Sequence, residues 1–494
     1  MESSIPNLLK QRAFLTPNRE AIVFNGESYS FLELYLQAKE LAGKIASLHV
    51  GQEDTVGILL KNRPHTFFII HALQQLRARA VFLNHRLTPS EMEFQLKDSG
   101  AKLLIAESDF NAVTDEIKVM HPSLEAVSVE DVFTQKEKLI PQHEEYGLQD
   151  VCSIMYTSGT TGKPKGVLQT YGNHWWSATG SALNLGIRGD DSWLCAVPLF
   201  HISGFSILMR SVIYGNTVYL IEQFHEENIN ELLVTGKVTI MSVVSAMLYR
   251  MLDVLKERRY HNRFRCMLLG GGPAPRPLLE TCVEKGIPVF QSYGMTETSS
   301  QIVTLSPEDS LRKLGSAGKP LFPSQLKIKA DGEEAEVHTP GEIIVKGPNV
   351  TIGYLNREDA NKENFNNGWF STGDIGYVDE EGFLYVMDRR SDLIISGGEN
   401  IYPAEVEEVL LSHPDILEAG VTGAKDPVWE QVPYGFIVTK ASLSEEDIIE
   451  FCQKHLAKYK IPKRIFSVSA LPRNASNKLL RRKLMDLLSE GGLE

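Results

Sequence analysis

The residues from Tyr156 to Gly166, Tyr-Thr-Ser-Gly-Thr-Thr-Gly-Lys-Pro-Lys-Gly, are nearly all hydroxyl, glycine or lysine residues, which excludes a buried position. The glycines let the backbone approach a ligand closely, the hydroxyl and N–H groups donate hydrogen bonds, and the lysines add positive charge. These properties indicate a phosphate-binding loop. The phosphate-binding residues that we predict are Thr157, Ser158, Gly159, Thr160, Thr161, Gly162, Lys163 and Lys165.

The apolar residues 151–156 predict a strand that ends at this loop, where open α/β sheets usually bind ligands. The loop is not a Walker A motif, because only two residues separate Gly159 from Gly162 and Pro164 follows Lys163. A flexible surface loop is the alternative, but linkers of this composition seldom carry two lysines around a proline.

Three other predicted strands also end in residues suited to ligand binding. His201 follows strand 193–198, a glycine-rich turn follows strand 266–270, and strand 288–292 continues into Tyr-Gly-Met-Thr-Glu. Taken singly, a histidine at such a place is usually structural, and the glycines serve a simple turn equally well. His201 is expected at the same end of the sheet as the phosphate loop, which favours its functional interpretation. The Tyr-Gly-Met-Thr-Glu segment gains weight because it follows the phosphate loop, whereas the glycines remain open between a simple turn and a surface for a flat ring.

The chain of 494 residues is too long for one hydrophobic core and predicts at least two domains. Between residues 54 and 106 short strands alternate with helical segments, which predicts a parallel sheet with crossover helices. Residues 107–150 are weakly patterned and predict only a strand near 124–129 and a surface loop. From about residue 314, short strands with Gly and Pro turns predict a small β-barrel or distorted sheet.

The last hundred residues predict an α+β domain. Its helices are expected at 403–412, 444–457 and 478–489, and its strands near 417–424 and 432–439. Residues 454–483 contain ten Lys or Arg and no Asp or Glu, a basic strip that would suit phosphate groups.

The net charge of −13 argues against general binding to nucleic acid or to anionic membranes. No run of about 18 apolar residues and no signal sequence is found, so we expect a cytoplasmic protein without membrane insertion. The five cysteines are far apart, as expected for reduced thiols. The sequence leaves the oligomeric state open, a homo-oligomer included.

The phosphate loop resembles the signature of the adenylate-forming enzymes, a superfamily of acyl-CoA synthetases, luciferases and peptide-synthetase adenylation domains. Further similar motifs are Tyr293-Gly-Met-Thr-Glu297, Trp369-Phe-Ser-Thr-Gly-Asp374, Asp388-Arg-Arg-Ser-Asp392 and Leu471-Pro-Arg-Asn-Ala-Ser-Asn-Lys478. The resemblance implies an α/β fold with a large N-terminal domain, residues 1–387, of parallel-rich sheets with helices plus the β-barrel-like part at about 314–387. It also implies a small mobile α+β C-terminal domain, residues 388–494, with its hinge at Asp388.

The resemblance also implies roles for single residues. Lys478, Thr157, Glu297 and His201 would be catalytic, and Glu297 would also bind Mg²⁺, an ion that prefers oxygen ligands. Besides the phosphate loop, the implied nucleotide-binding residues are Gly270, Gly271, Gly272, Pro273, Ser292, Tyr293, Gly294, Met295, Thr296, Asp374, Arg389 and Lys478. The implied acid-pocket residues are His201, Ser203, Gly271, Ser299 and Ser300, with Gln301 as a further polar candidate, and Gly397, Gly398 and Glu399 would line a CoA channel.

One departure from the family pattern lies next to the implied catalytic lysine, where Asn477 replaces a glycine. Asparagine is the residue that best tolerates a left-handed backbone, so we expect the loop to survive with Lys478 in place.

The activity implied is that of an ATP-dependent acid:CoA ligase, which uses ATP, Mg²⁺ and CoA on a small carboxylic acid. No nucleophile, base and orienting residue form a convincing set, and none is needed because a carboxylate is already ionised at neutral pH. Segments 10–17, 198–211, 291–298 and 314–320 are most similar to ligases whose acid carries a second carboxylate. Ligation of another aromatic or small to medium-chain acid, a luciferase-like oxygenase, a carrier-loading adenylation domain and a silent binding protein are the alternatives.

Overall fold

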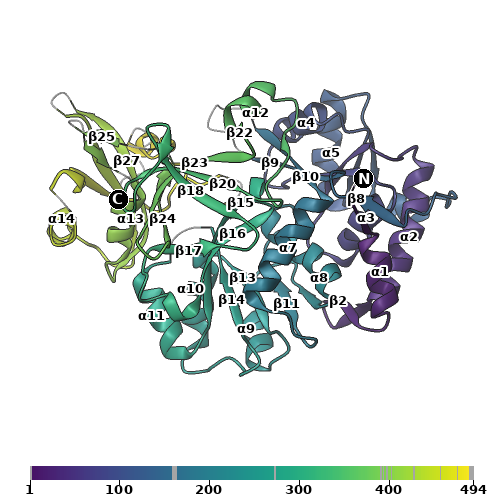
Figure 1. The fold of residues 1–494 in the computed structure, drawn as a ribbon, viewed down its shortest axis with the longest axis horizontal. Helices are drawn as coiled ribbons and strands as arrows, with labels where there is room; N and C mark the ends of the chain where they lie inside the picture. The colour runs from purple at the N-terminus through teal and green to yellow at the C-terminus, as the bar shows by residue number, and fades with distance from the viewer. Residues whose placement is uncertain are drawn as a thin grey trace.

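The computed structural model describes residues 3–157, 164–271, 274–389, 392, 394–396, 399–401, 403–426, 429–456, 458–474 and 477–488. Two large sheets with their helices form the N-terminal part, and a smaller sheet forms the C-terminal part (Figure 1). The C-terminal part lies at one end of the molecule beside β23 and β24, and α1 and α2 lie at the other end. The predicted α/β fold with a large N-terminal and a small C-terminal domain is confirmed.

The first sheet has seven strands and carries the phosphate loop. Its order is β21 (Gly353–Tyr354), β10 (Lys165–Thr170), β9 (Val151–Thr157), β5 (Arg79–Phe82), β4 (Thr55–Leu59), β6 (Leu103–Ala106) and β7 (Glu125–Ser128). The pairs from β9 to β7 are parallel, as the alternation of strands and helices predicts, whereas β10 returns antiparallel to β9. The loop between β9 and β10 therefore lies at the carboxyl end of the parallel strands.

The second sheet begins with an antiparallel hairpin and a parallel half. The strand order is β3 (Glu27–Ser30), β2 (Glu20–Phe24), β12 (Thr217–Leu220), β11 (Ser192–Cys195), β13 (Ile240–Val243), β14 (Cys266–Leu269) and β15 (Val289–Met295). From β2 to β15 every pair is parallel, so the ends of β11, β14 and β15 lie at one edge.

The same sheet continues beyond β15 as antiparallel strands, the region for which the sequence predicts a barrel or a distorted sheet. The order is β16 (Ser300–Leu305), β17 (Ser316–Pro320), β24 (Leu384–Arg389), β23 (Trp369–Val378), β20 (Gly341–Lys346), β18 (Gln325–Ala330) and β19 (Glu333–Glu334), with β22 (Phe365–Asn366) paired to β23. β23 and β24 lead the chain out of this sheet toward the C-terminal part.

The C-terminal sheet is built on one long antiparallel pair, β27 (Ile416–Asp426) and β28 (Glu430–Thr439). The other strands are β25 (Ile394–Ser396), β26 (Glu399–Ile401) and β29 (Arg464–Ser467), and the helices are α13 (Pro403–Leu411) and α14 (Glu445–Gln453).

The helix predicted at 478–489 is wrong for the residues that the structure describes there. Two short 3₁₀ turns take its place, at Arg481–Lys483 and Met485–Leu488. Leu484 is fully buried in a small cluster with Phe436, so the chain follows the surface of the sheet instead of winding away from it.

The helices of the N-terminal part cover and join the two large sheets. They are α1 (Leu8–Leu15), α2 (Phe31–Ser47), α3 (Pro64–Gln75), α4 (Pro89–Asp98), α5 (Asn111–Met120), α6 (Val129–Thr134), α7 (Tyr171–Leu185), α8 (Ile202–Tyr214), α9 (Glu226–Val234), α10 (Ser245–Leu255), α11 (Arg276–Lys285) and α12 (Glu358–Asn364). α7 contacts β10 of the first sheet and β16 of the second, and α8 packs beside it (Figure 1). The weakly patterned region 107–150 contains α5 and α6 in addition to the strand predicted there, and a short strand β8 (Glu145–Gly147) paired with β1 (Ser4–Pro6).

Local sequence signals explain several of these elements. Asn25 and Gly26 both have positive φ, as the two-residue turn of the β2–β3 hairpin requires. Ser30 caps α2 and forms a reciprocal capping box with Glu33. Within the described part of the chain, no helix is both long enough and apolar enough to cross a bilayer.

A buried ion pair fixes the starts of the strands in the second sheet. Arg265, before β14, donates from Nε to Asp191 Oδ1 at 2.7 Å and from Nη2 to Oδ2 at 2.5 Å, and Thr239 donates to the same carboxylate at 3.0 Å. Burial alone would raise the pKa of Asp191, but the hydrogen bonds and charge of Arg265 and the N–H of Arg188 hold that pKa below its usual value.

We expect Arg265→Met to lower the free energy of unfolding by about 3 kcal/mol, because it leaves a buried carboxylate without its cation. Since the pKa of Asp191 is lowered on folding, the pair stabilises the protein above the unfolded pKa of about 4, and this stabilisation is lost as the pH falls. Urea unfolding at neutral and acidic pH measures both effects. Arg258→Met is the control, because Arg258 forms an exposed pair with Glu231; an equal loss in both variants would contradict the assignment.

Candidate functional site

The phosphate loop is held at its base by a hairpin of the first sheet. Thr157 is the last residue of β9, and it pairs directly with Lys165, the first residue of β10. The Lys165 ammonium lies 5.2 Å from the centre of the Tyr354 ring, within range of a cation–π contact. Thr157 and Lys165 thus lie side by side at the carboxyl end of the parallel strands.

Glu297 approaches this hairpin from the second sheet. It lies in a 3₁₀ turn, Thr296–Thr298, which directly follows β15, and only 9% of its surface is exposed. Its Oε1 accepts a hydrogen bond of 2.9 Å from Tyr354 Oη, while Oε2 has no partner among the described residues. An oriented carboxylate with one available oxygen fits Mg²⁺, which takes one or two carboxylates together with substrate phosphates.

Polar contacts join the two sheets at this point. Gln169 of β10 donates to the carbonyl of Thr296 at 2.8 Å, and the Thr351 N–H donates to the carbonyl of Glu297 at 2.7 Å. Thr351 Oγ1 also donates to the carbonyl of Leu168 in β10. These bonds place the Glu297 turn beside the base of the phosphate loop.

Tyr293 of β15, the strand that leads into this turn, contacts Asp374. Tyr293 Oη donates to Asp374 Oδ2 at 2.8 Å, and Asp374 is buried in β23 opposite the backbone of Arg389 in β24. At the end of β14, Ser292 Oγ bonds the carbonyl of Leu269, next to Gly270. These predicted nucleotide-binding residues therefore lie on adjoining elements.

The backbone after Glu297 is tightly packed and unusual in conformation. Ser299 and Ser300 have φ of 52° and 106°, and a Cβ on Gly294 would lie 2.2 Å from the carbonyl oxygen of Ser300. Glycine is therefore required at position 294. Ser299 is fully buried, and its hydroxyl has no hydrogen bond to any residue that the structure describes, while Ser177 Oγ of α7 donates to its carbonyl at 2.6 Å.

His201 immediately precedes α8 and lies within a group of rings. The centre of its imidazole is 4.5 Å from that of Phe200, and Phe200 in turn contacts His85 at 5.0 Å. Burial lowers the pKa of His201 to about 4, and the positive charges of Arg86, Lys478 and His85 act in the same direction. The imidazole is therefore neutral near pH 7. Ser203, in the first turn of the same helix, is exposed.

Lys478 reaches the same region from the C-terminal part, since its charge acts on His201. Three bonds join the described residues before it, from the N–H of Asn477 to the Asn474 carbonyl, from the N–H of Lys478 to Asn474 Oδ1, and from the N–H of Asn474 to the Lys478 carbonyl. Asn477 has φ of 62°, so the predicted left-handed backbone is confirmed.

The basic strip at 454–483 is less concentrated than its sequence suggests. Several of its ten cations are engaged in ion pairs within the C-terminal part, namely Lys454, Lys460, Lys463, Arg464, Arg473 and Arg481. Most cations of the strip therefore pair with carboxylates of the C-terminal part itself.

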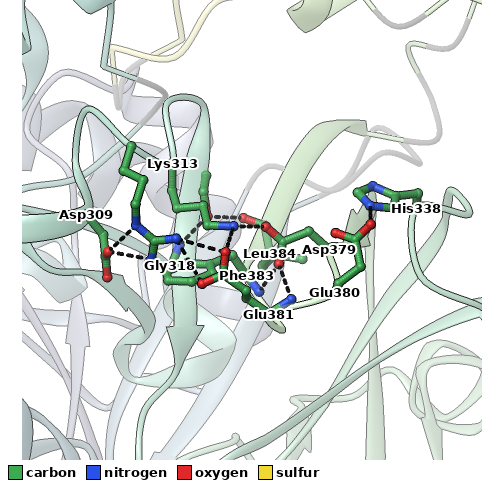
Figure 2. Close-up of polar contacts among 11 residues, drawn as sticks. Asp309, Lys313, Gly318, His338, Asp379, Glu380, Glu381, Phe383 and Leu384 are labelled. Carbon is green, nitrogen blue, oxygen red and sulfur yellow. Dashed lines mark hydrogen bonds and ion pairs between the residues drawn. The ribbon is translucent and has the colours of Figure 1, made fainter.

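The hairpin that leads to Asp388 is anchored by the ion-pair cluster in Figure 2. Lys313 contacts Asp379 at 2.7 Å and Glu381 at 2.6 Å, and Arg312 bridges Asp309 and Glu381. Asp379 also accepts the backbone N–H groups of Glu381 and Phe383. The hairpin β23–β24, from which the chain leaves the large sheet, is thus held by these ion pairs.

Part of the predicted site lies outside the described residues: Ser158, Gly159, Thr160, Thr161, Gly162, Lys163, Gly272, Pro273, Gly397 and Gly398. For Asp388, Arg389 and Glu399 the structure describes the backbone alone. Gly271, which is described, has φ of 88° at the end of β14, and Met295 and Thr296 lie between Tyr293 and Glu297.

Sequence reasoning missed Arg210 as a candidate. This arginine of α8 is 1% exposed, stacks over Trp193 at 5.3 Å, and leaves Nε and Nη2 without a hydrogen bond among the described residues. Ser299 Oγ and Gln301 Oε1 are unpaired as well. The signal in the sequence is one arginine in the otherwise mostly apolar stretch 205–213.

Comparison with known proteins agrees with this geometry. Residues 9–355 match the AMP-binding enzyme family, and residues 405–478 match the AMP-binding enzyme C-terminal domain. The chain belongs to the AMP-binding enzyme family. A 2-succinylbenzoate–CoA ligase from Geobacillus sp. (strain WCH70) is 57% identical over 490 residues, which cover 99% of this chain and 98% of the relative.

Solved structures of this family also match the chain. An o-succinylbenzoate CoA synthetase from Bacillus subtilis, in complex with an acyl-adenylate intermediate, has a TM-score of 0.93 at 51% identity, covering 98% of both chains. A double mutant of the Bacillus subtilis enzyme bound to a product analogue has a TM-score of only 0.77 at the same identity, covering 98% of this chain and 99% of that one. The backbone of the chain is thus nearer to the adenylate complex.

We expect the His201 imidazole to remain neutral at every pH above about 5, because burial and neighbouring cations oppose its protonation. Carbon-13 labelling of the histidine rings and an NMR titration of the apo protein measure this, and the missing resonance in His201→Gln assigns the signal. A midpoint near the unperturbed value of about 6.5 would contradict the assigned environment.

Proposed function

We propose that the chain is an AMP-forming ligase that converts 2-succinylbenzoate, ATP and CoA into 2-succinylbenzoyl-CoA, a step of menaquinone biosynthesis. The observation that carries the ligase activity is the convergence of Thr157 and Lys165, Glu297, and the Tyr293–Asp374 pair at the joined ends of the two sheets. The relatives that match nearly the whole chain support the choice of acid. Five buried free cysteines support a reducing cytoplasmic location.

In the first step the substrate carboxylate attacks the α-phosphate of ATP, forming the acyl-adenylate and releasing pyrophosphate. Residues 157–165 hold the β- and γ-phosphates, Asp374 binds the ribose hydroxyls, and Tyr293 lies against the adenine. Bound Mg²⁺, with Glu297 as its protein ligand, would neutralise charge on the phosphate oxygens. Because the nucleophile is already ionised, catalysis consists of positioning and of charge stabilisation.

Lys478 supplies positive charge where negative charge develops around the α-phosphate. Its location near His201 supports this role, because the acid and the α-phosphate must meet there. His201 lines the pocket, and because its imidazole is neutral it does not attract the acid as a cation would.

The second step requires CoA to reach the adenylate from the C-terminal side. We assign the domain boundary and hinge to Asp388, so that residues 388–494 rotate, withdraw Lys478 and present Gly397, Gly398 and Glu399 to the thiol arm. The anchored base of the hairpin β23–β24 supports this division, since rotation needs a fixed side to turn against.

Arg210 accounts for the second carboxylate of the acid. A buried guanidinium without an acidic partner is costly, and its cost is offset when a ligand supplies the anion. Tyr214, one turn along α8, lies between Arg210 and Ser181, and Gln301 contacts Ser181 at 3.4 Å. Arg210 and the unpaired groups of β16 therefore border one buried polar region between α7, α8 and β16.

We expect Lys478→Ala to lower the rate of adenylate formation by about 10²–10³, the usual loss for one preorganised donor, while CoA attack on preformed adenylate changes little. Acid-dependent pyrophosphate exchange measures the first half-reaction, and thioester formation from synthetic acyl-adenylate measures the second. Lys458→Ala, in the same basic strip, is the control. Equal loss of both half-reactions would contradict the role given to Lys478.

We expect Arg210→Met to lower kcat/KM for 2-succinylbenzoate by about 10²-fold, because a charge-assisted pair is lost. For 4-oxo-4-phenylbutanoate, which lacks the ring carboxylate, the wild-type enzyme should be poor and the variant should not be worse. Pyrophosphate exchange with both acids provides the comparison. A parallel loss with both acids would show that Arg210 acts only on the fold, and a wild type that prefers another acid would overturn the substrate assignment.

A further inference from the structure

Asn62 is a buried side chain that bridges the two large sheets. It lies between β4 of the first sheet and α3, and it is 7% exposed. Its Nδ2 donates to the carbonyls of Val197 at 2.9 Å and Ile221 at 3.3 Å, and its Oδ1 accepts the N–H of Leu199 at 2.9 Å. All three partners belong to segments that follow strands β11 and β12 of the second sheet.

The bonded segment is the one that leads directly to His201. β11 ends at Cys195, so the backbone groups of Val197 and Leu199 have left the sheet ladder and need other partners. Asn62 supplies them from the opposite sheet. Phe200 and His201 follow directly, and their rings make an edge-on contact with centres 4.5 Å apart.

Helix α8 presses on the same segment from its other side. A Cβ on Gly204 would lie 2.2 Å from the carbonyl oxygen of Pro198, so the helix approaches this backbone as closely as glycine allows. The His201 N–H also bonds the Pro198 carbonyl at 3.1 Å. Residues 197–201, which we call the pocket wall, are thus held between Asn62 and α8.

Asn62 is itself held by its neighbours. The Lys61 N–H and Arg63 Nη1 donate to the two oxygens of Glu107 at 2.8 and 2.6 Å, and His65 contacts the same carboxylate at 2.9 Å. The Glu107 side chain is 2% exposed. Residues 61–65 are therefore fixed at the end of β6, and the position of Asn62 is fixed with them.

We propose that Asn62 is a positioning residue for the acid pocket: it sets the place of Phe200 and His201 through the backbone of Val197 and Leu199. This inference rests on the proposed function. Asn62 acts through the pocket wall, so it affects how the acid binds, whereas the nucleotide is held by β9, β10, β15 and β23.

We expect Asn62→Ala and Asn62→Ser to raise KM for 2-succinylbenzoate about tenfold, because up to three hydrogen bonds that hold the pocket wall are lost, while KM for ATP stays within about twofold. Discrimination between 2-succinylbenzoate and benzoate should narrow in the same variants. Initial-rate kinetics of acid-dependent pyrophosphate exchange give these constants, and KM does not depend on how much of the variant protein is folded.

Asn230→Ala is the matched control. Asn230 is fully buried in α9, donates to the Met251 carbonyl and accepts from Tyr260 Oη, both at 2.8 Å, and it touches no part of the pocket wall. We expect this variant to lower Tm with KM for the acid unchanged. If both Asn62 variants behave like Asn230→Ala, the inference is overturned; if the wild type shows no exchange with the acid, the proposed function has failed instead.

Discussion

The site depends on the hydrogen bonds that join the two large sheets at their carboxyl ends. The phosphate loop belongs to the first sheet and the Glu297 turn to the second, so neither sheet holds the complete set of residues. Gln169, Thr351 and Tyr354 join the two sheets here. Gln169 and Thr351 bond backbone carbonyls of the turn, and Tyr354 bonds the Glu297 carboxylate. Because these bonds lie in a region of low dielectric, they are strong and hold the two halves in a fixed relative position.

The same division explains where buried polar groups occur. Where strands of the two sheets end against each other, some backbone groups have no hydrogen-bond partner within a sheet. Side chains such as Asn62 and Gln169 reach from one sheet to the other and donate hydrogen bonds to these groups. Some buried polar groups, among them Arg210 Nε and Nη2 and Ser299 Oγ, have no hydrogen-bond partner among the described residues, and a ligand or water can satisfy them. Such groups also occur elsewhere, for example at Thr114 in α5, so only those between α7, α8 and β16 bear on the proposed acid pocket.

The sequence predicts the strands before the phosphate loop and His201, because an apolar run followed by Gly, Ser or Thr is a local pattern. It also predicts the backbone of Asn477, since asparagine is among the residues enriched at left-handed φ. It does not predict Asn62, whose partners lie more than a hundred residues away in the chain. Nor does it predict Arg210, whose Nε and Nη2 have no hydrogen-bond partner among the described residues. The helix expected at 478–489 fails for the same reason, because the burial of Leu484 against Phe436 overrides local helical propensity.

The neutrality of His201 follows from this arrangement and has a mechanistic consequence. A protonated imidazole would stand beside Arg86 and Lys478, and that repulsion, added to burial, keeps the ring uncharged. A neutral ring cannot trap the incoming carboxylate as a tight ion pair in the ground state. In the proposed mechanism the acid is held by its distant carboxylate and by pocket shape, so the reacting carboxylate keeps its nucleophilicity and the charge of Lys478 acts where it lowers the barrier. Under that proposal, holding the segment that carries His201 in place contributes to catalysis.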